Sequence, residues 1–131
     1  MDNIVIVVVQ CFEELLVHQR NKNPEFYGLG AGGKIEKNES SKLAAIRKLE
    51  EELGIVSDVE PLFNFINSKS HPYTVYVYRT PDYTKKIKFT PCREFKLACW
   101  ISVPEMDKLV SEGKLLSDTR TTYEIIRREF I

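Results

Sequence analysis

The acidic residues between Glu39 and Glu52 are the part of this sequence best suited to chemistry. Glu51 and Glu52 close a stretch with helical periodicity, and Glu39 precedes that stretch in a loop. Residues three or four apart on a helix are neighbours, so the two glutamates can present carboxylates to one point with help from Glu39. Carboxylate oxygens together with a backbone carbonyl suit a hard octahedral cation, Mg²⁺ or Mn²⁺. Such a cation can bridge a diphosphate and orient a water, which predicts hydrolysis of a phosphoanhydride.

The element that must position these glutamates is a helix predicted over residues 42–53. Ser40 or Ser41 is expected to cap its start, and Gly54 is expected to end it. Apolar residues at helical spacing predict a core-facing stripe made of Leu43, Ile46, Leu49 and Leu53. The opposite, polar face is predicted to carry Arg47, Lys48, Glu51 and Glu52.

The rest of the chain alternates between strand and helix patterns. Strands are predicted over 4–9, 14–19, 59–66, 73–79, 85–89 and 95–103. A short helix is predicted over 105–111 after Pro104, and a last one runs from a cap at Asp118 or Thr119 to near Phe130. Before the first helix, a cluster of glycines indicates backbone that turns sharply or approaches another group closely: Gly28, Gly30, Gly32 and Gly33. This order predicts an α/β fold with helices on both faces of a sheet.

Composition limits the class of protein. A chain of 131 residues without a linker or a repeat has the length of one domain, predicted over 1–131. Lys plus Arg and Asp plus Glu both number 19, so no overall charge favours a nucleic-acid duplex or an anionic membrane. The cysteines lack disulfide or zinc spacing, which is typical of reduced thiols and predicts a cytoplasmic protein. The apolar stretch 4–9 is too short to span a membrane, and the sequence is compatible with a homodimer.

The run from Gly33 to Ile55 reads GKIEKNESSKLAAIRKLEEELGI and resembles the Nudix box. That motif is G-x5-E-x7-R-E-U-x-E-E-x-G-U, where U is a bulky aliphatic residue, and every fixed position except one matches. The chain is therefore similar to Nudix hydrolases of the MutT-like kind. The resemblance implies a Nudix-type α/β/α sandwich with a mixed central sheet, a divalent cation, and a nucleotide-type small molecule as substrate. The expected substrate is a nucleoside diphosphate linked to another moiety.

The same resemblance implies roles for the matched residues. The expected metal ligands are Glu51, Glu52, Glu39 and the Gly32 carbonyl. Arg47 is expected to orient the glutamates through charge-assisted hydrogen bonds. Glu94 stands six positions before Trp100, as an acidic residue does in the family, and is the candidate second-site ligand or general base. The expected catalytic residues are Glu51, Glu52, Arg47 and Glu94.

The departure from the box is Lys48, where the family has a metal-binding glutamate. A protonated lysine cannot ligate a metal, and it lies within reach of Glu51 and Glu52. Pairing with a glutamate on an exposed helix contributes only about 0.3 to 0.5 kcal/mol, which does not explain the residue. A loss of metal affinity by a factor of about 10 to 100 corresponds to roughly 1.4 to 2.7 kcal/mol. We therefore expect any activity to be weakened.

Lys48 leaves three interpretations of the function. The chain is a slow hydrolase, a hydrolase in which Lys48 contacts phosphate, or a domain that binds nucleotide without turnover. Lys34 and Arg20 are further candidate substrate-binding cations. A minor alternative is a protein similar to isopentenyl diphosphate isomerases, whose reaction needs a reactive cysteine in a context that this sequence lacks.

Several residues that could serve a site are better explained by the core. His18, alone within an apolar strand, is predicted to be a hydrogen-bonded structural histidine. Phe95 and Trp100 are predicted to pack in the core rather than against a substrate. For Phe26 and Tyr27, stacking on a base and closing the core stay equal alternatives.

Overall fold

The protein is described by a computed structural model over residues 2–68 and 70–131. Its strands, in chain order, are β1 (Ile4–Val8), β2 (Gln10–Cys11), β3 (Glu14–Arg20), β4 (Gly28–Leu29), β5 (Ala31–Lys34), β6 (Glu60–Asn67), β7 (Tyr73–Arg79) and β8 (Phe95–Ser102). Its helices are α1 (Ser41–Leu53), α2 (Val103–Ser111) and α3 (Ser117–Glu129). Within these described ranges, no helix combines the length and the apolar character needed to cross a membrane.

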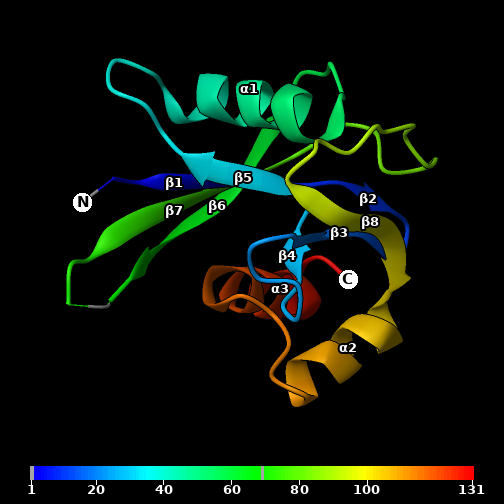
Figure 1. The fold of residues 1–131 in the computed structure, drawn as a ribbon. Helices are drawn as coiled ribbons and strands as arrows, with labels where there is room; N and C mark the ends of the chain where they lie inside the picture. The colour runs from blue at the N-terminus through cyan, green and yellow to red at the C-terminus, as the bar shows by residue number, and fades with distance from the viewer. Residues whose placement is uncertain (1, 69) are drawn as a thin grey trace.

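The strands form two four-stranded sheets between layers of helix (Figure 1). One sheet has the order β5-β1-β7-β6, with β1 and β7 parallel and the other pairs antiparallel. In the other sheet, β3 pairs antiparallel with β2, β4 and β8. Helix α1 lies on one side of the strands, and α2 and α3 lie on the opposite side (Figure 1). The predicted α/β/α sandwich with a mixed sheet is confirmed.

Strand β1 shows why both faces of the strands need cover. Successive side chains of a strand point to opposite faces, and four of the five residues of β1 are buried. Val5 packs in the core on the α1 side together with Leu49. Ile6 packs in the core on the α3 side together with Tyr123. The strands are therefore a central layer with an apolar core on each side.

The core-facing side of α1 differs from the predicted stripe at one residue. Leu49 and Leu53 are fully buried, as predicted, whereas Leu43 is 59% exposed. Ala44 and Ala45 are buried in its place. The helix is rotated so that these small side chains face the strands, which permits close packing and turns Leu43 toward solvent.

The prediction of a strand over residues 85–89 is wrong. The alternating pattern itself is meaningful, because Ile87 and Phe89 pack, partly buried, against the core on the α1 side. No described strand pairs with this segment, and it stays irregular. Alternation alone does not supply the hydrogen-bonding partner that a strand requires.

The predicted cap of the last helix is also wrong. Helix α3 begins at Ser117 and its N-cap position is Leu116, without a side-chain cap. Asp118 instead uses a carboxylate oxygen to accept a hydrogen bond from the Tyr73 hydroxyl at 2.7 Å. Asp118 therefore makes a tertiary contact with Tyr73 instead of capping the helix, as its local sequence had predicted.

The glycine cluster both turns sharply and permits close approach, as predicted. Gly30 joins β4 to β5 in the left-handed region, with φ of 56°. A Cβ atom built on Gly32 would lie 2.5 Å from the Val5 carbonyl oxygen, so only glycine fits against β1 there. These glycines bring β5 close to β1 and leave its backbone facing α1.

The aromatic residues assigned to the core lie in or against it. Phe95 is buried in the core on the α1 side, and Trp100 packs partly buried against the same core. Tyr27 packs against the core on the α3 side, and its N–H donates to the Lys114 carbonyl at 2.8 Å. Core closure is therefore the alternative that holds for Tyr27.

Candidate active site

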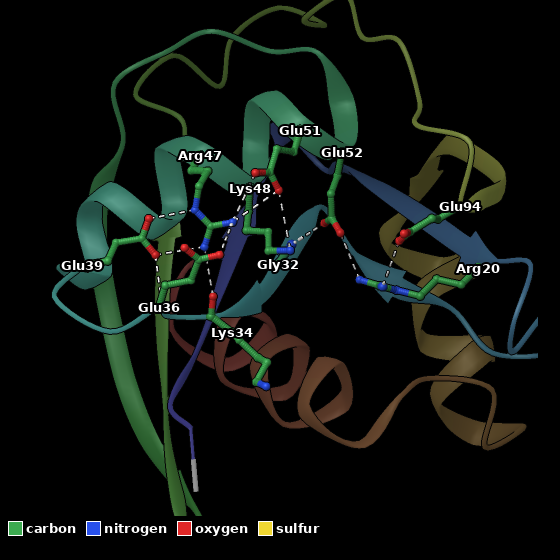
Figure 2. Close-up of polar contacts among 10 residues, drawn as sticks. All are labelled: Arg20, Gly32, Lys34, Glu36, Glu39, Arg47, Lys48, Glu51, Glu52 and Glu94. Carbon is green, nitrogen blue, oxygen red and sulfur yellow. Dashed lines mark hydrogen bonds and ion pairs between the residues drawn. The ribbon is translucent and has the colours of Figure 1, made fainter.

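Helix α1 positions most of the predicted site, and both of its ends are fixed by sequence. The Ser40 hydroxyl accepts a hydrogen bond from the Leu43 N–H at 3.1 Å, which caps the start of the helix. Gly54 ends the helix in the left-handed conformation, with φ of 65°, and its N–H donates to the Glu50 carbonyl at 2.9 Å. The polar side of α1 consequently faces β5 and the end of β3 (Figure 2).

Arg47 connects the helix to the loop before it. Its guanidinium donates two hydrogen bonds to Glu39, at 2.8 and 2.9 Å, and bonds to Glu51 at 3.3 Å and to the Lys34 carbonyl at 3.2 Å (Figure 2). The hydrogen bonds from Arg47 lower the pKa of Glu39 to about 2, and those from Glu39 raise the pKa of Arg47. Arg47 therefore holds both Glu39 and Glu51 in place.

Glu52 does not lie on the solvent-exposed polar face where the helical spacing placed it. Its side chain is buried, with one oxygen accepting the Gly32 N–H at 2.8 Å and the other accepting from Arg20 at 3.2 Å (Figure 2). Burial raises the pKa of Glu52, while the Gly32 hydrogen bond and the Arg20 charge oppose that rise. Glu52 is the buried acid of this site, and β5 and β3 hold it.

Glu94 reaches the same place from the long loop before β8. Its carboxylate lies 3.9 Å from Arg20, the same guanidinium that contacts Glu52 (Figure 2). The loop is fastened to the end of α1, because the Cys92 N–H donates to the Glu52 backbone carbonyl at 2.9 Å. The Asn21 N–H donates to the Glu94 carbonyl at 2.8 Å and ties the loop to the end of β3. Two segments about forty residues apart therefore converge on Arg20.

Lys48 lies against the backbone of β5. A Cβ atom built on Gly33 would stand 2.6 Å from Lys48 Cε, so the lysine stem occupies the space that glycine leaves open. Its ammonium lies 3.8 Å from a carboxylate oxygen of Glu51. Its charge also lowers the pKa of Glu52, although burial outweighs this effect. The lysine is thus placed among the predicted metal ligands.

The predicted substrate-binding cations are divided between separate hollows. Arg20 lines a cavity of about 450 Å³ beneath β5 and a second one of about 530 Å³ beside Glu94. Lys34 and Lys48 instead line a hollow of about 380 Å³ on the outer side of β5. Lys34 forms an exposed ion pair with Asp2 at 3.0 Å. The structure therefore groups Arg20, and not Lys34, with Glu52.

The predicted metal ligands are close to one another but not assembled. Among residues 2–68 and 70–131, no group of three or more His, Cys, Asp or Glu side chains is arranged to hold a metal ion. Glu39 binds Arg47, Glu51 contacts Arg47 and Lys48, and Glu52 and Glu94 share Arg20. Each carboxylate of the predicted set thus has a cationic partner in this structure.

Sequence reasoning missed two contributions to the cavity beneath β5. His18 is the hydrogen-bonded histidine that was predicted, yet it also lines this cavity. Lys22 lines it too, and shares with Arg20 the wall of the adjoining 530 Å³ cavity. The only signal in the sequence was a basic residue two positions beyond Arg20, which by itself indicates a solvated turn.

The model of the NUDIX domain matches residues 1–122. No curated protein matches the sequence significantly. The solution structure of the E. coli ORF135 protein is similar in fold, with a TM-score of 0.74 and 23% identity over 97% of this chain and 91% of that one.

Two further solved structures similar in fold contain ligands. The NUDIX domain of Shewanella oneidensis NrtR, complexed with ADP ribose, has a TM-score of 0.79 and 19% identity over 100% of this chain and 89% of that one. A bifunctional NMN adenylyltransferase/ADP ribose pyrophosphatase from Francisella tularensis, complexed with AMP and a Mn ion, has a TM-score of 0.73 and 18% identity. That match covers 98% of this chain and 41% of the Francisella chain.

Proposed function

Because the chain belongs to the Nudix family, we propose that it hydrolyses a phosphoanhydride in a nucleoside diphosphate linked to another moiety. The reaction depends on Mg²⁺ or Mn²⁺ and is slowed by Lys48. The observation that carries the proposal is Glu52, an acid 4% exposed with a raised pKa, which contacts Arg20, a residue that lines two cavities. A buried acid with a perturbed pKa that is paired with a cation lining a cavity is typical of a functional site.

The carboxylates around Arg20 fit a hard divalent cation in their chemistry. Mg²⁺ usually keeps several waters and binds through one or two carboxylates plus the phosphates of its substrate, rather than in a cage of protein ligands. Glu52 contacts Arg20, and Glu51 is exposed on the same turn of α1, so these two acids would hold the cation, with the Gly32 carbonyl as a further donor. Glu94, which also lies near Arg20, would remain free to act on a water. When bound, the cation would neutralise charge on the diphosphate and activate a water.

Phosphate binding, orientation of the carboxylates and activation of water would be carried out by side chains that the fold holds in place. Arg20 and Lys22 line both cavities and are placed to bind phosphate oxygens. The Gly32 N–H holds Glu52, and Arg47 holds Glu51, so both carboxylates are restrained before substrate binds, and the cation has to replace part of their present contacts. Glu94, whose side chain is 76% exposed, is the candidate general base because it can reach a water beside Arg20.

Lys48 supports the slow rate in this proposal. Its ammonium competes for Glu51, from which it is separated by 3.8 Å, and adds positive charge where the divalent cation would bind. The contact with Gly33 limits how far the lysine stem can withdraw. The positive charge of Lys48 therefore opposes binding of the cation, and the negative charges of Glu51 and Glu52 offset this repulsion only in part.

The test is a panel of nucleoside diphosphate derivatives, including ADP-ribose, incubated with Mg²⁺ or Mn²⁺. We expect release of a nucleoside monophosphate, and we expect Glu52→Gln to reduce it by more than about 100-fold, because the effect of losing a ligand should exceed that of losing a neighbour of the ligand. Glu50→Gln is the matched control, since Glu50 is exposed on the same helix. Equal product from wild type and Glu52→Gln would remove Glu52 from the mechanism.

A second candidate function is nucleotide binding without turnover. The observation that favours it is that each predicted ligand carboxylate already contacts Arg20, Arg47 or Lys48. In that case wild type binds substrate without product, and Lys48→Glu begins to hydrolyse it. Lys108→Glu, an equal charge change on α2, serves as the control and should leave turnover unchanged. Unchanged turnover in Lys48→Glu would show that Lys48 is not the limiting feature.

A further inference from the structure

The cavity beneath β5 is lined by a histidine that the proposed reaction does not use. The cavity is about 450 Å³, within the range of small-molecule sites, and its walls include His18, Gly28 and Arg20. His18 is 4% exposed and lies on β3, opposite Gly28 of β4. A buried polar group at the wall of a cavity of this size needs a hydrogen-bond partner.

The contacts of the His18 ring determine which nitrogen carries the proton. Nδ1 lies 2.7 Å from the Gly30 carbonyl oxygen, which can only accept, so Nδ1 is the protonated nitrogen and donates. Burial lowers the pKa of His18 to about 4, and the ring is therefore neutral near pH 7. Nε2 is left with a lone pair, and within the described part of the chain no group donates a hydrogen bond to it.

The surroundings hold the ring in one orientation. Phe95 stacks on it, with ring centroids 4.1 Å apart and planes inclined by 2°. A Cβ atom built on Gly28 would lie 2.4 Å from Nε2, so the ring occupies the space that this glycine leaves free. The acceptor nitrogen is thus fixed in direction by the carbonyl, by the stacked ring and by the residue across the strand pair.

The cavity wall carries cations, the Asp118 carboxylate and His18, which lies two residues before Arg20 on β3. Arg20 and Lys22 stand where this cavity meets the one beside Glu94, which suits phosphate oxygens. His18 lies within the cavity and offers only an acceptor. A molecule that is anionic at one end and carries an N–H donor on an apolar ring at the other would satisfy both.

We propose that His18 is a specificity-determining residue, whose Nε2 accepts a hydrogen bond from the exocyclic amino group of a nucleobase bound beneath β5. The inference rests on the proposed function in that the ligand is a nucleotide. A site that hydrogen-bonds one substrate group rejects an analogue lacking it, because the buried acceptor is then left unpaired. His18 acts on selection among bases and takes no part in the bond that breaks.

The experiment measures binding without metal, by calorimetry, for two ligand pairs that differ by one amino group. The pairs are AMP with purine riboside 5′-monophosphate, and GMP with IMP. Wild type should prefer the amino-bearing member of at least one pair about 5- to 10-fold. His18→Phe, which retains a ring to stack on Phe95, should lose that preference, and the matched exposed variant His71→Phe should keep it. Absence of a preference in wild type for both pairs, or its persistence in His18→Phe, would overturn the proposal.

A second measurement avoids the risk that His18→Phe is misfolded. Imidazole ¹⁵N spectra of wild type at pH 7 should show a neutral ring protonated at Nδ1, with the Nε2 resonance shifting when the preferred monophosphate is added. A ring protonated at Nε2, or an unmoved Nε2 resonance at saturation, would contradict the role of His18. Both readouts are independent of hydrolysis, so failure of the hydrolysis panel and failure of this inference can be told apart.

Discussion

At the scale of single residues, the site consists of acidic side chains paired with cationic ones. The sequence identified these residues but did not predict how they pair. Glu52 is buried on Arg20, and Glu51 remains exposed between Arg47 and Lys48. The Lys48 side chain does not extend into solvent, because its stem packs against the Gly33 backbone. The strength with which this site binds a divalent cation should therefore depend on residue 48 more than on any exposed neighbour.

Changing Lys48 should alter metal affinity directly, before any catalysis. Lys48→Glu adds a carboxylate and removes a charge, so we expect Mn²⁺ to bind the free protein at least about 10- to 100-fold more tightly. Lys48→Met removes the charge without adding a ligand and should give a smaller gain. Electron paramagnetic resonance titration of Mn²⁺ measures both. Equal affinity for wild type and the two variants would show that the lysine does not compete with the cation.

At the scale of elements, the unit that matters is α1 with the segments fastened to it. Its first turn is capped by Ser40, its polar side is tied to the preceding loop by Arg47, and its last carbonyls hold the loop that carries Glu94. The helix therefore holds candidate site residues that belong to three separate parts of the sequence. A weakened helix start should be felt as a loss of stability.

Removing the cap of α1 tests this role of the helix. Ser40→Ala leaves the Leu43 N–H without its acceptor, and we expect the free energy of unfolding to fall by about 1 kcal/mol. Ser40→Gly should reduce it by only a few tenths of that amount, because glycine is tolerated at this position. Urea denaturation followed by circular dichroism gives both values. A larger loss for Gly than for Ala would point to another role for Ser40.

At the scale of the whole molecule, burial between the layers changes how the protein responds to acid. His18 has a pKa of about 4 in the fold, against an ordinary value of 6.5, because burial disfavours its charged form. Between these values the unfolded chain binds a proton that the native chain does not. The corresponding stability is complete above pH 6.5 and is lost as the pH falls toward 4.

The acid dependence of unfolding should therefore contain a contribution from His18. We expect about 3 kcal/mol of stability to be lost through this group between pH 6.5 and 4. The loss of stability over that interval should be smaller in His18→Phe by this amount and unchanged in His71→Phe, whose side chain is exposed. Denaturant unfolding at several pH values provides the comparison. An identical loss in wild type and His18→Phe would mean that folding does not lower the pKa of His18.

Much of this architecture was predictable because it depends on local patterns. The hydrophobic run of β1, the helical spacing of α1, its Ser40 and Gly54 ends and the close approach of the glycines are each encoded within a few residues. The segment 85–89 was not predictable in the same way, since its alternation resembles a strand while pairing needs a partner. Leu43 was misplaced because a period fixes a stripe but not its rotation against neighbouring strands.

The sequence alone determined the family resemblance, the acids and the lysine among them, because these depend on residue type and spacing. Only the tertiary structure decided that Glu52 is buried and bonded to Arg20, that Glu94 lies near the same arginine, and that Lys34 lines a separate hollow. It also placed His18 at the wall of a cavity that no sequence pattern had predicted. The physical reason is that these contacts join β3, β5, α1 and the loop before β8, whose mutual placement comes from packing of the two cores rather than from any local preference.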